Sequence, residues 1–292
     1  MRVRATAVNR ADLLQRMGAY PAPADSPADI PGLEIAGDID AIGAGVERLA
    51  VGDRVFGLLG GGGYAEAAVT HERALAKIPD GISFEDAAAI PEAFVTAHDA
   101  MVTRAGLTSG ETVLVHAIGS GVGTAAVQLG RALGAFVIGT ARTADKLARA
   151  KPLGMDKGIV PDAGAFATLV QKLGGAHVAL ELVGGKYLDE DLRAMRTLGW
   201  IVLVGLMAGA RGELDLSLLL RKRLTLIGTV LRARPIEEKI AAMRAFEDQV
   251  VPLLARGKIA PVIDVVMPLE QASAAHERMA SNAGFGKIIL RV

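Results

Sequence analysis

The sequence predicts an α/β protein in which a β-rich unit is followed by a doubly wound parallel sheet. Within residues 1–92, short apolar runs are separated by glycine clusters, a pattern typical of strands joined by tight turns. From Ser83 onward, near-continuous apolar runs alternate with helix-like segments. Such runs indicate strands that are buried on both faces of a parallel sheet by covering helices.

The individual elements follow from these runs in chain order. In the β-rich unit we expect a strand at 35–42, a turn at 43–45, a strand at 51–55 and a turn at 60–63. Ser83, with Asp86 three residues later, predicts a helix start. The parallel sheet is expected to have strands at 112–117, 135–140, 158–160, 177–182, 200–205 and 224–231, and helices at 122–133, 143–150, 166–173 and 188–197. The tail is expected to pack back on the first unit, with a charged helix from Pro235 to about 256, a strand at 262–267, a helix at 269–280 and a strand at 287–292.

Composition narrows the classes of function. The 292 residues include no cysteine, which excludes disulfides, zinc–thiolate sites and a cysteine nucleophile. Lys+Arg and Asp+Glu both number 32, so neither a nucleic-acid surface nor an electrostatic membrane anchor is expected. Residues 112–130 carry no charge, but their glycines, His116 and Gln128 favour a buried strand–turn–helix over a membrane span. We therefore expect a cytoplasmic protein that acts on small molecules.

The glycine-rich turn is the most informative motif. The segment TVLVHAIGSGVGTAAVQLGRALG at 112–134 joins a strand to a helix. Glycines let backbone N–H groups approach a pyrophosphate, and a helix N-terminus favours its charge. We interpret Gly119, Ser120, Gly121 and Val122 as cofactor-binding. The strict G-x-G-x-x-G pattern is not met, since Ser120 and Thr124 take two of its positions, and the alternative is a turn that serves packing only.

The end of the next strand indicates NADPH rather than NADH. An NAD site usually places Asp or Glu there to bind the ribose 2′-hydroxyl, but no carboxylate occurs before Asp145. Arg142, Thr143 and Lys146 can instead bind a 2′-phosphate. The alternative is that Arg142 and Lys146 are ordinary solvated residues at a helix start.

Several motifs together resemble one family. They are NRADLLQR (9–16), GAYP (18–21), PGLEIAG (31–37), VGDRV (51–55), HA with SGVG (116–123), LRAR (231–234) and GKIIL (286–290). The chain resembles the zinc-independent quinone oxidoreductases of the medium-chain dehydrogenase/reductase superfamily, and most of all their p53-inducible type. The resemblance implies a Rossmann domain that binds NADPH (94–234) and a GroES-like catalytic domain (1–93, completed by 235–292) that is short at its N-terminus. It also implies an active-site cleft between these domains.

The resemblance implies roles for further residues. Asn9 and Asp12 would lie beside the nicotinamide as catalytic residues, and Tyr20 would either donate a hydrogen bond to the acceptor or only pack against Pro21. Gly205, Leu206 and Met207 end a strand at the carboxyl edge of the sheet, where ligands bind in such folds. The other implied cofactor contacts are Thr96, Leu231, Arg232 and Lys287. Helix packing is the alternative for Thr96, and a solvated charge is the alternative for Lys287.

Zinc is not expected. Zinc-dependent relatives have Cys where Asn9 stands and His where Leu33 stands, and the five histidines show no ligand spacing. Glu34 is expected to pair with an arginine.

The implied activity is NADPH-dependent quinone reduction by hydride transfer. The alternatives are an NADPH-dependent 2-alkenal or enone reductase and a non-catalytic NADPH-binding protein. A homodimer is implied as well, through the apolar edge strand at 224–231, unless a loop covers that edge.

Overall fold

The computed structural model describes residues 1–161 and 165–292. These residues form two compact units, which we call unit 1 (Met1–Thr96 and Leu231–Val292) and unit 2 (Ala97–Val230). The chain therefore begins in unit 1, passes once through unit 2 and ends in unit 1.

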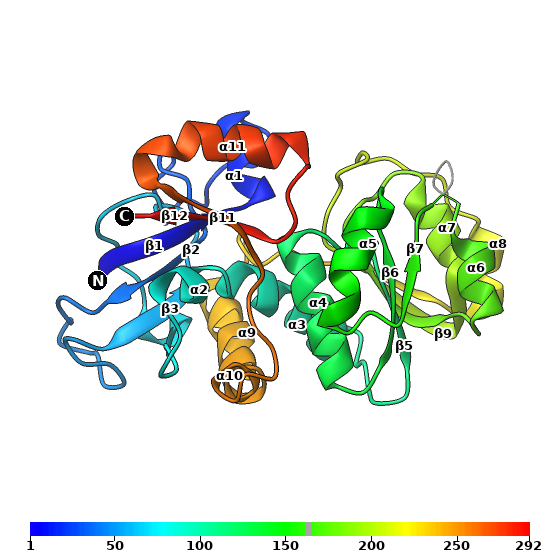
Figure 1. The fold of residues 1–292 in the computed structure, drawn as a ribbon, viewed down its shortest axis with the longest axis horizontal. Helices are drawn as coiled ribbons and strands as arrows, with labels where there is room; N and C mark the ends of the chain where they lie inside the picture. Colours follow the sequence, from blue (N-terminus) through cyan, green and yellow to red (C-terminus); the bar gives the residue numbers. More distant parts are fainter. Residues whose placement is uncertain (162–164) are drawn as a thin grey trace. The chain divides into compact units, whose positions relative to one another are not determined.

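Unit 1 is built on a six-stranded sheet in the order β11-β12-β1-β2-β3-β4. Its pairs are antiparallel except β11 with β12. Val8 and Ile288 of the central strands join Leu13 and Ala275 of two helices in one buried apolar cluster, and Figure 1 shows these helices, α1 and α11, beside each other. The strands are β1 (Arg2–Val8), β2 (Glu34–Asp38), β3 (Arg54–Leu58), β4 (Leu75–Lys77), β11 (Ile263–Pro268) and β12 (Lys287–Arg291), and the helices are α1 (Arg10–Arg16), α2 (Phe84–Ala88), η2 (Pro91–Val95), α9 (Ile236–Gln249), α10 (Val251–Ala255) and α11 (Ala272–Ser281).

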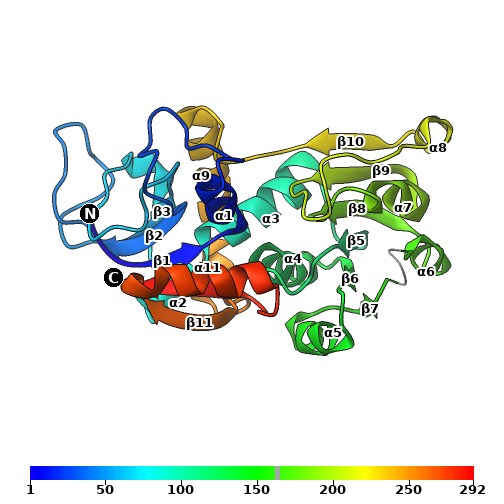
Figure 2. The ribbon, with the colours of Figure 1, turned by 90° about the horizontal axis from the view of Figure 1, so that it is seen from above.

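Unit 2 contains a parallel sheet in the order β10-β9-β8-β5-β6-β7. Its first strand, β5, pairs with both β6 and β8, so the sheet grows outward from β5 in both directions, as the sequence predicts for a doubly wound fold. Figure 2 shows α4 and α5 on one face and α6 and α7 on the other. The strands are β5 (Thr112–Val115), β6 (Phe136–Thr140), β7 (Lys157–Ile159), β8 (Ala176–Glu181), β9 (Met195–Leu203) and β10 (Thr225–Gly228), and the helices are η3 (Asp99–Arg104), α4 (Gly121–Ala132), α5 (Ala144–Ala150), α6 (Ala167–Lys172), α7 (Tyr187–Ala194) and α8 (Leu216–Lys222), with the short α3 (Thr96–His98) at the junction of the units.

Several predicted boundaries are wrong. The helix expected at 188–197 ends at Ala194, and β9 begins at Met195. The helix expected after Pro235 is two helices, because Pro252 has no N–H with which to continue the hydrogen bonds of α9. Helix α1 was not among the elements predicted from the sequence. Among the described helices, none combines the length and apolarity that a bilayer crossing requires.

Candidate active site

Lys287 anchors a buried polar cluster in unit 1. Its ammonium donates to Glu34 Oε1 and to Asn9 Oδ1, each at 2.6 Å, and the Asn9 side-chain amide donates to the same Glu34 oxygen at 2.7 Å. Lys287 is 4% exposed and Glu34 is not exposed at all. The expected arginine partner of Glu34 is therefore wrong, since its partner is this lysine. The alternative that Lys287 is a solvated charge is also wrong, and its cofactor contact stays a prediction. Burial of the two charges is tolerable because they are paired and hydrogen-bonded.

Asp12 joins the start of α1 to a neighbouring loop. Its Oδ2 accepts the N–H of Asn9 at 2.7 Å and the hydroxyl of Tyr64 at 3.2 Å, while Oδ1 accepts the N–H of Gly32 at 3.0 Å. Burial raises the pKa of Asp12, and these hydrogen bonds oppose that shift. Asn9 and Asp12 thus lie together, and each oxygen of Asp12 accepts a backbone N–H group. Their place beside the nicotinamide stays a prediction.

Arg232 holds the segment that carries Tyr20. Its guanidinium donates to the carbonyl of Gly60 at 2.7 Å, to the carbonyl of Tyr20 at 3.1 Å and to Gln15 Oε1 at 2.5 Å. The same group lies 5.2 Å from the centre of the Tyr20 ring, within cation–π range. Arg232 is 5% exposed, so in unit 1 it positions Tyr20, and its cofactor contact stays a prediction. The other predicted cofactor contacts in unit 1, Thr96 and Leu231, are also buried.

Glu92 is a member of this cluster that the sequence analysis missed. Its backbone N–H donates to Glu34 Oε2 at 2.8 Å. Burial, reinforced by the charge of Glu34, raises the pKa of Glu92 to about 8, so the group holds a proton at neutral pH. Local sequence gives no signal for this role, because Glu92 and Glu34 are 58 residues apart.

In unit 2 the glycine-rich turn forms a tight cradle between β5 and α4. Ala117 has a left-handed backbone (φ +47), and the Ser120 hydroxyl caps the helix by accepting the N–H of Gly123 at 3.0 Å. A Cβ atom on Gly123 would lie 2.5 Å from the Ala117 carbonyl oxygen, so only glycine permits this approach. Gly121 and Val122 stay partly exposed at the helix N-terminus, where backbone N–H groups can bind an anion. The cradle therefore fits a pyrophosphate.

The predicted 2′-phosphate residues lie together after β6, the strand next to β5. Arg142 and Thr143 are exposed, and Thr143 is the N-cap of α5. Lys146 lies in the first turn of that helix, which also carries Asp145. A phosphate at this position would meet one guanidinium, one ammonium and a helix N-terminus, and this donor set suits a dianion.

The segment after β9 ends at the same carboxyl edge of the sheet. Leu206 is 50% exposed and Met207 is 51% exposed. Gly205 lies against β8: its N–H donates to the Glu181 carbonyl at 3.2 Å, and a Cβ atom there would lie 2.7 Å from the Leu182 carbonyl oxygen. This edge offers an apolar surface that a nicotinamide ring could contact.

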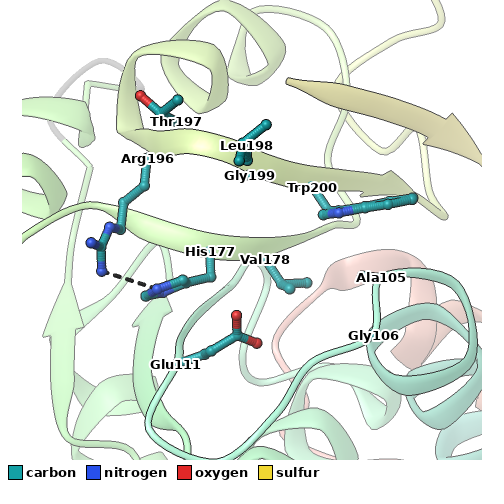
Figure 3. A pocket seen from close by; sticks show the side chains of 10 residues that line it. All are labelled: Ala105, Gly106, Glu111, His177, Val178, Arg196, Thr197, Leu198, Gly199 and Trp200. Carbon is teal, nitrogen blue, oxygen red and sulfur yellow. Dashed lines mark hydrogen bonds between the residues drawn. The ribbon is translucent and has the colours of Figure 1, made fainter. Parts of the chain in front are cut away.

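A separate pocket lies at the opposite, amino edge of the sheet. Figure 3 shows Arg196 reaching to His177, with 3.0 Å between their nitrogen atoms, and the Glu111 carboxylate and the Trp200 ring beside them. Its volume is about 430 Å³. None of the predicted site residues lines this pocket, so it is distinct from the candidate cofactor site.

Two protein families match separate parts of the chain. Residues 1–80 match the family described as alcohol dehydrogenase GroES-like domain, and residues 121–248 match the family described as zinc-binding dehydrogenase. Both matches confirm the predicted fold class, a GroES-like domain with a Rossmann sheet.

The similar proteins include polyketide synthases and quinone oxidoreductases. The chain is 42% identical over 208 residues, 70% of its length, to erythronolide synthase EryA2 of Saccharopolyspora erythraea, and it spans 6% of that protein. It spans 13% and 5% of two further polyketide synthases that it matches. It is 32% identical to the quinone oxidoreductase of Pseudomonas aeruginosa, over 99% of this chain and 90% of that protein.

The solved structures that match include a quinone oxidoreductase, an enoyl reductase and an NAD-dependent alcohol dehydrogenase. The quinone oxidoreductase of Thermus thermophilus, described together with its NADPH complex, matches with a TM-score of 0.84 and 32% identity, over 100% of this chain and 90% of that one. The CurK enoyl reductase matches with a TM-score of 0.87 and 26% identity, over the same shares of the two chains.

Proposed function

Because the chain belongs to the medium-chain dehydrogenase/reductase superfamily, we propose that it is a zinc-independent, NADPH-dependent quinone reductase of the p53-inducible type. The observation that carries this proposal is the Lys287 ammonium between Asn9 and Glu34. By resemblance, Asn9 stands where zinc-dependent relatives have a metal-binding cysteine. A cation of the protein already neutralises Glu34 at that place, and it would repel a dication.

A quinone suits a site of this kind. It accepts hydride without a Lewis acid, since the hydroquinone formed is aromatic. One quinone, one NADPH and one proton give one hydroquinone and one NADP⁺, and NADPH supplies the hydride. The residues of the chain supply binding and orientation: the glycine-rich turn would hold the pyrophosphate, and Arg142 with Lys146 the 2′-phosphate. Burial raises the pKa of Tyr20, so its phenol keeps the proton with which it would bond a quinone oxygen.

An enone reductase is the second candidate. The 42% identity to a polyketide synthase and the likeness to the CurK enoyl reductase favour it. On this scaffold the hydride would attack the β-carbon of an enone, and Tyr20 would bond its carbonyl oxygen.

The first test is turnover with two acceptors. We expect the protein to oxidise NADPH when 1,2-naphthoquinone is supplied and to be much slower with crotonaldehyde, both followed by the loss of NADPH absorbance. The reverse order would favour the enone reductase. Tight NADPH binding with no oxidation by either acceptor would exclude both enzymes and leave a binding protein.

We also propose a homodimer paired through β10. This strand is an edge of its sheet, and Leu216, Leu220 and Val230 near it are large exposed apolar side chains, a combination that favours pairing. Sedimentation equilibrium should give twice the mass of the 30.2 kDa chain. Leu220→Glu should shift the equilibrium toward the monomer, and a wild-type monomer at micromolar concentration would contradict the proposal. A cytoplasmic location stays a prediction.

A further inference from the structure

Three titratable side chains that the proposed reaction does not use meet in the interior of unit 2. His116 follows β5, Glu181 ends β8 and Asp191 lies on α7, and none of them has any exposed surface. His116 Nε2 lies 2.8 Å from Asp191 Oδ1 and 3.7 Å from Glu181 Oε2. Its Nδ1 lies 2.8 Å from the hydroxyl of Thr140, at the end of β6. The cluster thus joins the carboxyl ends of β8, β5 and β6, which are neighbours in the sheet.

The two carboxyl groups are incompletely bonded. Among the described residues, Glu181 Oε2 and Asp191 Oδ2 are buried and meet no donor. Each group has an oxygen within 4.8 Å of an oxygen of the other, and two buried carboxylates at this separation repel each other strongly unless one of them carries a proton. A metal ion explains the cluster less well: three ligand atoms lie within 4.8 Å of one another, but His116 and Asp191 already meet at hydrogen-bond distance.

We propose that Glu181 and Asp191 share one proton, and that this proton is required to hold the turns of unit 2 that bind the cofactor. The inference rests on the proposed function insofar as those turns bind NADPH. Glu181 and Asp191 are positioning residues, since they would act on the cofactor only through the backbone.

Glu181 connects the proton to the turn after β8 and to the segment after β9 that carries Gly205, Leu206 and Met207. Its Oε1 accepts the N–H groups of Val183 and Gly184, the latter at 2.8 Å. Its carbonyl oxygen accepts the N–H groups of Val204 at 2.8 Å and Gly205 at 3.2 Å. Loss of the shared proton would leave two like charges together in a low dielectric, so the carboxyl groups would separate and displace both turns.

Among the residues that the structure describes, no buried lysine or arginine faces the two carboxyl groups in place of the proton. Burial lowers the pKa of His116, which is therefore neutral at pH 7. Burial is also the main cause that raises the pKa of Glu181 to about 8 and that of Asp191 to about 7. The other titratable groups that face the cluster are Tyr187 and Glu190 on α7 and Arg142 after β6. The shared proton is therefore held at neutral pH and lost above about pH 8.

The test is the affinity for NADPH as a function of pH. At pH 9, about one unit above the pKa, only about a tenth of the molecules keep the proton, so the wild-type Kd for NADPH should rise about tenfold relative to pH 7. In Glu181→Gln an amide takes the place of the protonated carboxyl, so its Kd should change less than about twofold between these pH values. Asp189→Asn is the matched control and should behave as the wild type, because Asp189 is a partly exposed acid on α7 that pairs with Arg193.

Two readouts are independent of the cofactor. Infrared spectra of the wild type should show a signal of protonated carboxyl groups at pH 7 that decreases by pH 9. In Glu181→Gln only the smaller part of this signal that comes from Glu92 should remain. Because the folded-state pKa of Glu181 lies above its ordinary value of 4.5, the stability it contributes is complete below pH 4.5 and is lost as the pH rises through 8. The free energy of unfolding should fall less over this range in Glu181→Gln than in the wild type.

Two results would overturn the proposal. One is a titrating infrared signal that is as large in Glu181→Gln as in the wild type. The other is a rise in Kd that is equal in wild type and Glu181→Gln; should Glu181→Gln fail to fold, Asp191→Asn, whose amide can donate to Glu181, serves the same comparison. If NADPH does not bind at all, the proposed cofactor is wrong, and the infrared comparison still decides whether the proton is shared.

Discussion

Replacing Lys287 with methionine is expected to lower the free energy of unfolding by about 3–5 kcal/mol. The substitution keeps most of the apolar stem but leaves the Glu34 carboxylate, which has no exposed surface, without its cation. Asn9 would lose the ammonium that its Oδ1 accepts from. Urea denaturation at pH 7, followed by circular dichroism, measures the change.

Two further variants separate this effect from a general cost of removing a charge. Arg291 lies on the same strand and pairs with Glu85 at 2.7 Å, but its side chain is 64% exposed, so Arg291→Met should cost less than about 1 kcal/mol. The double variant Lys287→Met with Glu34→Gln removes the uncompensated charge and should recover part of the loss. If Lys287→Met costs no more than Arg291→Met, the buried ion pair does not stabilise unit 1.

The parallel sheet could be predicted because the residues that indicate each strand and turn are adjacent in the sequence. β5 is buried along its whole length, so its sequence is an uninterrupted apolar run, and the glycine-rich turn after it is contiguous in the chain. The same holds for the residues after β6, where Arg142, Thr143 and Lys146 fall within one helical turn. Spacing along the chain was sufficient to group them.

The start of β9 and the break between α9 and α10 were mispredicted because the local sequence there resembles a continuing helix. Residues 196–198 of β9 are exposed, and Leu198 has a left-handed backbone (φ +66). The start of this strand therefore shows neither an apolar run nor an alternation of exposed and buried side chains, and it resembles the end of the preceding helix. The break between α9 and α10 did have a signal, Pro252, which the long amphipathic pattern concealed.

The polar clusters could not be predicted because their partners are distant in sequence. Lys287 and Glu34 are 253 residues apart, and they meet because β12 pairs with β1, which in turn pairs with β2. His116 and Asp191 are 75 residues apart. A lysine before a terminal strand and an acid within an acidic helix both have the local pattern of solvated residues. Only the fold shows that these charges are buried and must be compensated.

The charged groups of the two units differ in their surroundings. Lys287 gives unit 1 a buried cation paired with the Glu34 carboxylate. In unit 2, Arg142 is exposed and Lys146 is partly exposed, and exposed cations of this kind add little to the stability of the fold. Under the proposed function they would bind the 2′-phosphate, the group that distinguishes NADPH from NADH.

Replacing Arg142 or Lys146 with alanine is expected to weaken NADPH binding by about tenfold or more each, because a charge-assisted hydrogen bond contributes about 1.5–3 kcal/mol. NADH lacks the 2′-phosphate, so its Kd should change less than about twofold, and the preference for NADPH should fall. The two Kd values can be measured by quenching of protein fluorescence. Higher salt should reduce the wild-type preference, since exposed charges are screened.

Arg149→Ala provides the matched control, because Arg149 is an exposed arginine in the last turn of the same helix. It should leave both Kd values near those of the wild type. An unchanged preference for NADPH in both Arg142→Ala and Lys146→Ala would show that the 2′-phosphate binds elsewhere. Equal losses for NADPH and NADH would instead mean that these residues support the turn after β6 rather than contact the phosphate, and the choice of cofactor would then depend on other residues.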